Sequence, residues 1–469
     1  MEQSPHKKQS GQIIIVALIF MAVTSTAIVA LVGYAGLQIR SHRQAVARTQ
    51  ALSIAEAGIE QAIWKLNNQP GYPGENNTAY SNGTFSITLT NMSASTKLIR
   101  ADAYVPNASN PVGRRSVQVT ATIGTTNIGF NYGVQAGEGG FSLDPNSRVN
   151  GNLYSNGPVV GTSGNVVAGD VIAGGPTGTI SQLSSITGNS WSHTIQNSNV
   201  GGNASHYNLV STNVTGNANV HSMSNCSIGG NASYNTQFNC TIGGTATTPN
   251  SSVPLDPAQE PLPIDDAQIN TWEQDAQAGG VIGSQTISGT VPLGPIKIDG
   301  NLTLNIDAEL QLTGTVWVTG NLTVNNNARI RLSPSYGSLS GLIIVGTEGS
   351  STAGTVNLQN NVQICGSGIG DCVTNPPTPG SYTMILSQKT GIATPAIQIR
   401  NNVQGAIFYA GTGEVRVSNN GGGNEITAYK VFLDNNAVVN YETGLANSNF
   451  TSGPGGGWEV ADQTWQLLQ

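Results

Sequence analysis

Four cysteines are the side chains whose type and spacing predict the most specific chemistry, and they form two local pairs. Cys226 and Cys240 lie 14 residues apart in the related segments NCSIGG and NCTIGG, while Cys365 and Cys372 bracket the segment GSGIGD. Stacking such segments at the strand spacing of roughly 4.8 Å would bring the first pair within disulfide range, about 4.4 to 6.8 Å between Cα atoms. We expect both pairs to form disulfides, although a coil of twice that length would place Cys226 and Cys240 on different faces. Neither spacing is typical of a structural zinc site.

Histidine, serine and charged residues do not predict catalysis. His193 and His221 share one phase of a 14-residue repeat and His206 is one residue out of it, with no carboxylate in the same strip. We expect turn or surface residues here rather than metal ligands, and no serine stands in an elbow motif with His and Asp companions. Charges that a polysaccharide-active enzyme could use are scattered, which we interpret as solvated faces: Asp299, Asp307, Glu309, Arg329, Arg331, Arg400 and Arg416. We therefore predict a protein that is not an enzyme, with no catalytic residue, metal or cofactor.

The composition predicts a chain made mostly of short strands and tight turns. Charged residues make up 9% of the sequence, whereas a typical globular domain carries about 25%. The 59 glycines and an excess of Asn, Ser and Thr fill the difference, and these residue types favour turns and strands over helices. A net charge of -7, with only 18 lysines and arginines, excludes a basic surface for nucleic acid.

A charge-free stretch near the N-terminus predicts a membrane anchor. The 25 residues from Ile13 to Leu37 contain no charge, and a helix of that length exceeds the roughly 30 Å hydrocarbon core of a bilayer. The apolar core of a secretory signal is only about 7 to 15 residues long, so an anchor is the better interpretation. Basic residues flank the stretch on both sides, so the charge rule alone does not choose its orientation.

The helix is expected to continue past the membrane, over residues 12–68. Apolar residues recur at spacings of three and four through AVARTQALSIAEAGIEQAIWKLN, and Pro70 follows the last turn. A half-helix that is apolar on one face must pack against something. Strands with alternating polarity over residues 83–91, 97–105 and 114–124 predict a small antiparallel sheet in the region 69–126 that supplies this partner.

These features together resemble a type IV pilin-like protein. The resemblance rests on a short basic leader ending in Gly11, a hydrophobic helix from the next residue, the segment AEAGIEQAIWKLN and the sheet after it. The stretch AEAG is most similar to minor pilins of the PilX kind. The resemblance implies that residues 1–11 are a cytoplasmic leader, which a prepilin peptidase cuts between Gly11 and Gln12. It also implies that the helix, beginning Ile13, Ile14, Ile15 and Val16, packs against other pilin subunits in a filament.

One departure from this pattern concerns the filament contact. Pilins resembling the major kind have Phe at the first mature position and Glu at the fifth, where this sequence has Gln12 and Val16. A charge in hydrocarbon is costly and is kept for a partner, so its absence implies that this subunit does not make that pairing. A minor or tip subunit fits this departure, and a bitopic anchor that is never cut is the alternative.

A 14-residue repeat predicts a β-solenoid over residues 127–246. An Ile or Val followed by a Gly-containing turn recurs without slippage from residue 172 to residue 246, which is typical of stacked coils. We expect the glycines at 188, 202, 216, 230 and 244 to occupy one turn that needs positive φ. We also expect a ladder whose side-chain amides hydrogen-bond along the axis, formed by Asn189, Asn203, Asn217 and Asn231.

Larger and less regular coils are predicted for a second stack over residues 295–446. Asn-Asn followed by Ala or Val occurs at 326, 360, 401 and 435. The linker 247–294 is rich in proline, and a helix is expected over 263–278 with Ile269, Trp272 and Ala276 on one face. We interpret this helix as a cap or brace on the solenoid, and a partner-binding helix is the alternative. The tail 447–469 is expected to dock as a final strand.

The sequence thus predicts a mainly β protein with a long N-terminal helix, a small antiparallel sheet and a parallel β-helix. Its predicted function is that of a minor or tip pilin-like subunit, in the cytoplasmic membrane by a single pass, with the β-helix outside the cytoplasm for surface contact or adhesion. The expected partners are other pilin subunits, the prepilin peptidase, the lipid bilayer and a glycan or protein surface, with no nucleic acid. A static envelope protein is the first alternative, and a polysaccharide-active enzyme is the second.

Overall fold

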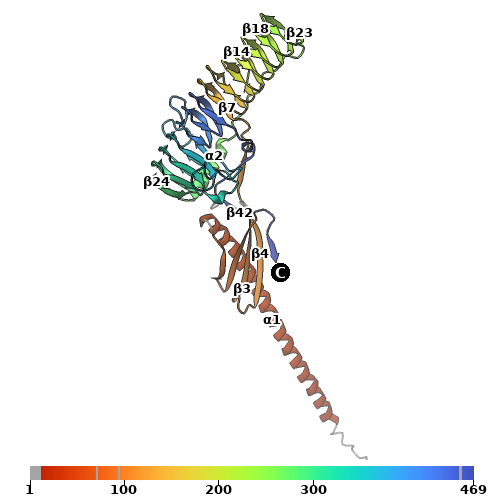
Figure 1. Cartoon of the computed structure of the whole chain (residues 1–469). Coiled ribbons are helices and arrows are strands. Elements are labelled where there is room, and N and C mark those ends of the chain that lie inside the picture. Colours follow the sequence, from red (N-terminus) through yellow and green to blue (C-terminus); the bar gives the residue numbers. More distant parts are fainter. Residues whose placement is uncertain (1–11, 70–71, 93–95, 454–456, 469) are drawn as a thin grey trace, which may run out of the picture.

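The protein, described here from a computed structural model, has three parts in a line: an N-terminal helix, a small sheet packed on it and a long stack of coils (Figure 1). The structure describes residues 12–69, 72–92, 96–453 and 457–468, so the predicted leader 1–11 lies outside the described residues. The predicted fold class is confirmed, because strands dominate and one long helix precedes them.

Helix α1 runs without a break from Gln12–Asn68, 57 residues, a length of about 85 Å at 1.5 Å per residue. Within residues 13–46 every side chain is exposed except Thr24, which is half-buried. By length and composition this helix can cross a membrane. The apolar half of α1 therefore has no partner within the described chain.

The second half of α1 packs on an antiparallel sheet, the head of the molecule. Small helix residues allow the close approach, since a Cβ added at Gly58 would lie 3.2 Å from the side chains of Ile87 and Phe85. The helix residues buried there are Ala47, Ala51, Ile54, Ala55, Ile59, Ala62 and Leu66. The strands, in spatial order, are β1 (Glu75–Tyr80), β2 (Gly83–Asn91), β3 (Thr96–Val105) and β4 (Gly113–Ile123).

The C-terminal tail completes this sheet. Strands β42 (Trp458–Val460) and β43 (Gln466–Leu468) both pair antiparallel with β4. The Asn67 side chain donates to the Trp458 carbonyl at 3.0 Å and accepts from its N–H at 2.7 Å. Between head and coils, β5 (Thr125–Ile128) pairs antiparallel with β41 (Ser448–Thr451). The β-helix is thus an insertion in the head sheet, connected by two chain segments.

The coils form one continuous parallel β-helix whose order in space differs from the order in sequence. Strand β39 (Glu425–Leu433) pairs in parallel with β6 (Val134–Leu143), and β40 (Val438–Asn440) pairs with β7 (Arg148–Asn150). The chain therefore enters in the middle of the stack, climbs to its far end, returns, and builds the lower coils from residue 281 up to the entry point. Figure 1 shows this as orange coils resting on blue ones.

The β-helix has a long sheet and two further sheets that share the remaining side. The long sheet contains β6, β8 (Leu153–Ser155), β9 (Val159–Val160), β11 (Val171–Ala173), β12 (Thr179–Ser181), β14 (Ser190–Gln196), β16 (Ala204–Val210), β18 (Ala218–Ser224), β20 (Ala232–Ser233), β21 (Thr236–Phe238), β23 (Ala246–Thr247), β24 (Val281–Ile287), β26 (Ile296–Leu304), β28 (Val316–Val318), β29 (Leu322–Val324), β31 (Gly341–Val345), β32 (Val356–Leu358), β34 (Thr383–Ser387), β35 (Ile397–Ile399), β37 (Ile407–Val417) and β39. The upper sheet contains β7, β10 (Val166–Val167), β13 (Ser185–Ile186), β15 (Asn199–Val200), β17 (Asn213–Val214), β19 (Ser227–Ile228), β22 (Thr241–Ile242), β38 (Gly422–Gly423) and β40. The lower sheet contains β25 (Thr290–Leu293), β27 (Glu309–Leu312), β30 (Arg329–Leu332), β33 (Gln363–Ser367) and β36 (Gln404–Gly405).

One coil of the regular region takes 14 residues, which decides between the two coil lengths considered above. Ala204 pairs with Ala218, and Ala218 pairs with Ala232. Likewise Val200 pairs with Val214. Each repeat thus returns the same side chain to the same interior line, where it is buried.

The expectation of positive φ at the repeat glycines is wrong. None of the glycines at 188, 202, 216, 230 and 244 has positive φ, whereas Asn197, Ser211, Asn225 and Asn239 do. The glycines are needed for close approach instead: a Cβ at Gly216 would lie 2.5 Å from the Gly202 carbonyl oxygen. The left-handed turn lies instead at the corner of the coil that contains Asn225 and Asn239, because asparagine adopts positive φ more readily than most residues.

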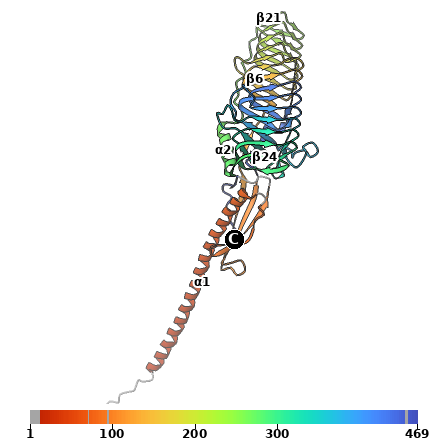
Figure 2. The same cartoon turned by 90° about the vertical axis from the view of Figure 1, so that its left-hand side faces the viewer.

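A strap, residues 248–265, carries the chain back down the outside of the stack. Trp191 donates to the Leu255 carbonyl at 2.9 Å, and Tyr409 donates to the Ile264 carbonyl at 2.6 Å. The strap ends in α2 (Asp266–Ala278), where the Asp265 side chain caps the helix by accepting from the Gln268 N–H. The buried face of α2 consists of Ile269, Trp272 and Ala276, and the helix lies against the side of the lower coils (Figure 2). The strap and α2 together brace the β-helix across the junction between its upper coils and its lower coils.

Candidate functional site

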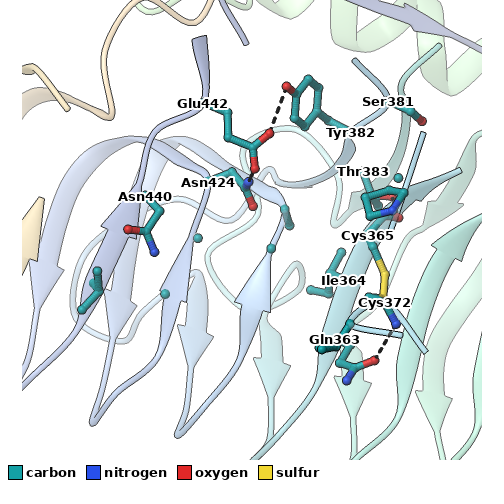
Figure 3. A pocket seen from close by; sticks show the side chains of 18 of the residues that line it. Gln363, Ile364, Cys365, Cys372, Ser381, Tyr382, Thr383, Asn424, Asn440 and Glu442 are labelled. Carbon is teal, nitrogen blue, oxygen red and sulfur yellow. Dashed lines mark hydrogen bonds between the residues drawn. A yellow bond between two sulfur atoms is a disulfide. The ribbon is translucent and has the colours of Figure 1, made fainter. Parts of the chain in front are cut away.

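A groove of about 800 Å³ lies where β33, β36, β38 and β40 follow one another on the side of the β-helix (Figure 3). Its floor is low because glycines without side chains occupy it, at positions 405, 421, 422 and 423. The N–H of Gly422 donates to the Val403 carbonyl at 2.9 Å, and that of Asn424 to the Ala406 carbonyl at 2.9 Å. The floor strands are thus bonded to their neighbours and present a face rather than a free edge.

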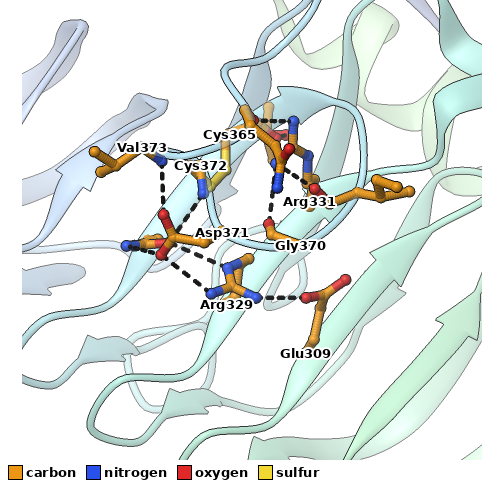
Figure 4. Close-up of a disulfide and its surroundings, with 12 residues drawn as sticks. Glu309, Arg329, Arg331, Cys365, Gly370, Asp371, Cys372 and Val373 are labelled. Carbon is orange, nitrogen blue, oxygen red and sulfur yellow. Dashed lines mark hydrogen bonds and ion pairs between the residues drawn. A yellow bond between two sulfur atoms is a disulfide. The ribbon is translucent and has the colours of Figure 1, made fainter.

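The loop 366–380 forms one wall of the groove, and three attachments hold it. The first is the cysteine pair Cys365 and Cys372, which lies at disulfide distance with 6.3 Å between Cα atoms. The second and third are Arg331 and Arg329, which approach the loop from the neighbouring strand β30 (Figure 4). A wall attached at several points is pre-organised for binding.

Arg331 is fully buried, so its interpretation as a charge on a solvated face was wrong. Its guanidinium donates to the carbonyls of Ile369 at 3.1 Å, Gly370 at 3.0 Å and Asn375 at 2.8 Å. Burial lowers the pKa of Arg331 from its usual value. The loop carbonyls accept from the two terminal nitrogens and so offset much of the cost of burying the charge, while Nε has no partner among the described residues. The same bonds hold the loop in shape around the cation.

Arg329 also has partners that the sequence did not indicate. It lies between Glu309, at 2.6 Å, and Asp371 of the loop, at 3.4 Å. The backbone N–H of Thr374 and the side chain of Gln363 lower the pKa of Asp371 to about 2, so this carboxylate stays ionised near neutral pH. The lower rim of the wall is therefore an ion-pair network.

At the opposite rim of the groove stands the carboxylate of Glu442. Asn424 donates to it at 2.5 Å and the Tyr382 hydroxyl donates at 3.2 Å. Burial and the nearby Glu442 raise the pKa of Tyr382 to about 12, which keeps the hydroxyl protonated as a donor. Glu442 is the sole carboxylate among the described residues that line the groove.

Exposed carboxamides line the same side. Asn420 and Asn436 have φ of 61° and 59° and belong to a left-handed turn repeated at Asn327, Asn361 and Asn402. Lower members of that ladder bond to each other, as Asn361 donates to Asn327 at 3.1 Å. Within the described chain, the side chains of Asn420 and Asn436 make no such bond and are free for a ligand.

The predicted asparagine ladder exists with different bonds. The Asn189 side-chain oxygen accepts from the backbone N–H of Asn203 at 2.9 Å, and the step repeats at Asn217 and Asn231. Amide-to-amide bonds occur instead at the left-handed corner and on the strand beside it, for example from Asn239 to Asn225 at 2.9 Å. The side-chain oxygens of the ladder thus accept from backbone N–H groups of the next coil, while the exposed side-chain NH2 groups of Asn203, Asn217 and Asn231 have no partner among the described residues.

The second cysteine pair closes the far end of the stack. Cys226 and Cys240 lie over each other in consecutive coils, 4.5 Å apart at Cα and at disulfide distance. The coil that holds Cys240 is the last, and most of its residues are exposed. The pair therefore ties the final coil to the one below it.

The histidines occupy an environment that the sequence only partly indicated. Tyr207 stacks between His193 and His221, with ring centroids 5.1 Å and 4.5 Å away. The strap brings the carboxylate of Asp256 to 2.9 Å from His193, which corrects the expectation of a strip without a carboxylate. His206 is fully buried between the hydroxyls of neighbouring serines, and burial lowers its pKa to about 3.

The residues predicted for leader cleavage and filament packing lie at the start of α1. Gly11 is outside the described residues, and Gln12 is the first residue of the helix. The side chains of Ile13, Ile14, Ile15 and Val16 are between 59% and 72% exposed. Since each of them is apolar, they are available to lipid or to another helix.

Fold and site define an elongated, mainly β protein with one apolar helix and a grooved β-helix inserted in its head. No protein-family model matches the sequence, and no curated protein matches it. Among solved structures, the chain is similar to the crystal structure of competence-associated pilin ComZ from Thermus thermophilus, at 12% identity over 90% of this chain and 97% of that chain. The TM-score is 0.27, so the superposition is too loose to carry either fold or role to this chain.

Proposed function

We propose that this protein is a pilin-like subunit, of the minor or tip kind and similar to PilX-type minor pilins, that displays its β-helix outside the cytoplasmic membrane for surface contact. Its partners would be other pilin subunits, the bilayer and a prepilin peptidase that cuts between Gly11 and Gln12. The C-terminal parts would then lie outside the cytoplasm.

One observation carries this proposal: a single unbroken helix is shared between an exposed apolar half and a half packed on an antiparallel sheet. Thirty-four consecutive residues, 13–46, precede the first buried one, Ala47. Such a helix cannot remain in water, because its apolar surface would drive association. It can lie in a bilayer, and it can also move into a bundle of similar helices without any change in the head.

The position of the β-helix supports a place at the end of a filament. It extends from the end of the head opposite the exposed half of α1 (Figures 1 and 2). A subunit stacked beyond this head would have to pass beside the bulky coils. Val16 stands where pilins resembling the major kind carry a glutamate for a neighbouring subunit, and this departure supports the same position.

We also propose that the β-helix binds and does not catalyse. Glycoside hydrolysis takes a pair of carboxyl groups on either side of the scissile bond, and within the part of the chain that the structure describes Glu442 is the one carboxylate in the groove lining. This favours recognition over hydrolysis. The static envelope protein remains the alternative, since it needs the same anchor and the same groove.

Mass spectrometry of the mature N-terminus, on membrane and sheared-filament fractions, tests the proposal. We expect a chain that starts at Gln12 in both fractions, and uncut chain in cells that lack a prepilin peptidase. Gly11→Val should block cutting, whereas the matched Ser10→Val should not. An intact leader on the wild-type chain would refute the pilin-like role, and cut chain confined to membranes would favour the static alternative.

A further inference from the structure

We propose that the groove between loop 366–380 and Glu442 binds a neutral oligosaccharide. The inference deepens the surface-contact role proposed above and rests on that role only for its biological purpose. The groove volume of about 800 Å³ falls in the range of roughly 300 to 1,000 Å³ that is typical of small-ligand sites.

The charge of the lining selects a neutral ligand. Among the described residues, no lysine or arginine lines the groove, and Glu442 is the one carboxylate in its lining. Polysaccharides rich in uronate or sulfate would meet this carboxylate with no cation to offset the repulsion. A neutral ligand incurs no such penalty.

The hydrogen-bonding groups fit hydroxyls. Each sugar hydroxyl donates and accepts, and a carboxamide also offers both functions from one side chain. Asn420 and Asn436 present theirs to solvent, and Asn440 accepts from Asn150 at 2.7 Å while its own N–H groups stay available. The Glu442 carboxylate, oriented by Asn424 and Tyr382 (Figure 3), can accept short charge-assisted bonds from two hydroxyls.

The shape of the groove fits an elongated chain. It crosses four successive coils, from β33 to β40, which are three intervals of about 4.8 Å or roughly 14 Å in all. The exposed Val373 and the half-buried Pro377 line the loop side, and their apolar atoms can pack on the C–H face of a sugar ring. A peptide would instead seek a free strand edge, and the floor strands here are already bonded to their neighbours.

Binding of the purified full chain to immobilised probes tests the inference, in a detergent without a sugar headgroup. The probes are neutral gluco-, galacto- and N-acetylglucosamine oligosaccharides, polygalacturonate, and a neutral peptide rich in Ser and Asn. The groove variant is Asn420→Gly with Asn436→Gly, which removes two carboxamides while relieving positive φ. Its matched control is Asn327→Gly with Asn361→Gly, in the same repeated turn outside the groove. Glu442→Gln tests the carboxylate.

We expect one or more neutral oligosaccharides to bind, the groove variant to bind about tenfold more weakly, and the control to bind like the wild type. Glu442→Gln should also weaken binding by about tenfold or more. Binding of polygalacturonate or peptide alone, no binding of any probe, or an equal loss in the control variant would overturn the inference. Because binding is measured on purified chain, the result does not depend on whether the chain is cut or assembled.

Discussion

Replacing Gly216 with alanine tests why the repeat needs glycine. An ideal Cβ there would lie 2.5 Å from the Gly202 carbonyl oxygen and 2.8 Å from the Asn203 side-chain oxygen. That carbonyl already accepts from the Gly216 N–H at 3.1 Å, so the two coils must separate to make room. Overpacking of this kind costs about 1–3 kcal/mol, and the reduced freedom of the unfolded chain returns about 0.4–1 kcal/mol.

The net loss is therefore about 1–2 kcal/mol, or roughly tenfold in a local opening equilibrium. Hydrogen exchange on the full-length chain can measure it, in peptides that cover residues 199–233. Gly283→Ala is the matched control, because a Cβ there would meet nothing within 4 Å and its φ is not positive. We expect exchange near Gly216 to accelerate about tenfold and exchange near Gly283 to change little.

A second substitution at the same position separates the two explanations for glycine. If positive φ were the reason, Gly216→Asn would be tolerated better than Gly216→Ala, since Asn adopts the left-handed region more readily. Close approach predicts that Asn is at least as damaging, because it has the same Cβ and more atoms. Rescue by Asn, or unchanged exchange in the Ala variant, would refute the reasoning.

Three further predictions concern other buried groups. His206→Val should reduce the sensitivity of the fold to acid, and valine fits the position because Val220 occupies the same place one coil on. The folded-state pKa of His206 is about 3 and lies below the unfolded value of about 6.5. The neutral form therefore stabilises the fold above pH 6.5, and that contribution is lost as the pH falls from there toward 3. Thermal unfolding at pH 7 and pH 5 measures this, and an equal loss in variant and wild type would contradict it. Arg331→Met should destabilise loop 366–380 by roughly 2–3 kcal/mol, seen as faster proteolysis there alone, while unchanged cleavage would show that the loop holds without it. Replacing both Cys226 and Cys240 with serine should speed exchange in the last coil, with an expected loss of about 2–4 kcal/mol, and an effect spread over the lower coils would contradict a local tie.

Much of the regular structure follows from repeated local signals. A constant spacing predicts that the same residue type returns to the same line, which is why the 14-residue coil and the stacking of Cys226 over Cys240 could be expected. The long helix also follows from a charge-free run joined to an amphipathic one. Such signals need only neighbouring coils or turns.

Little of the candidate site could be predicted from the sequence. Glu442, Asn424 and Tyr382 meet from different coils with no common spacing. In the sequence nothing distinguishes Arg331 from a solvent-exposed arginine, because the loop carbonyls that surround it come from residues 38 to 44 positions away. The Asn-Asn repeat was the one available signal, and it indicated a turn without showing which copies remain free.

The sequence by itself determined the helix and the 14-residue period of the regular repeat, since periodicity specifies interactions at a fixed offset. The structure decided that one coil takes a single period and that the repeat glycines allow close approach rather than positive φ. Only the tertiary structure decided that the later coils lie beneath the earlier ones, that β42 and β43 complete the head sheet, and that the strap crosses the junction. These contacts join residues from 64 positions apart, as for Trp191 and Leu255, to 391 positions apart, as for Asn67 and Trp458. They depend on how well two coil ends or two strand edges fit each other, and such a fit leaves no period in the sequence.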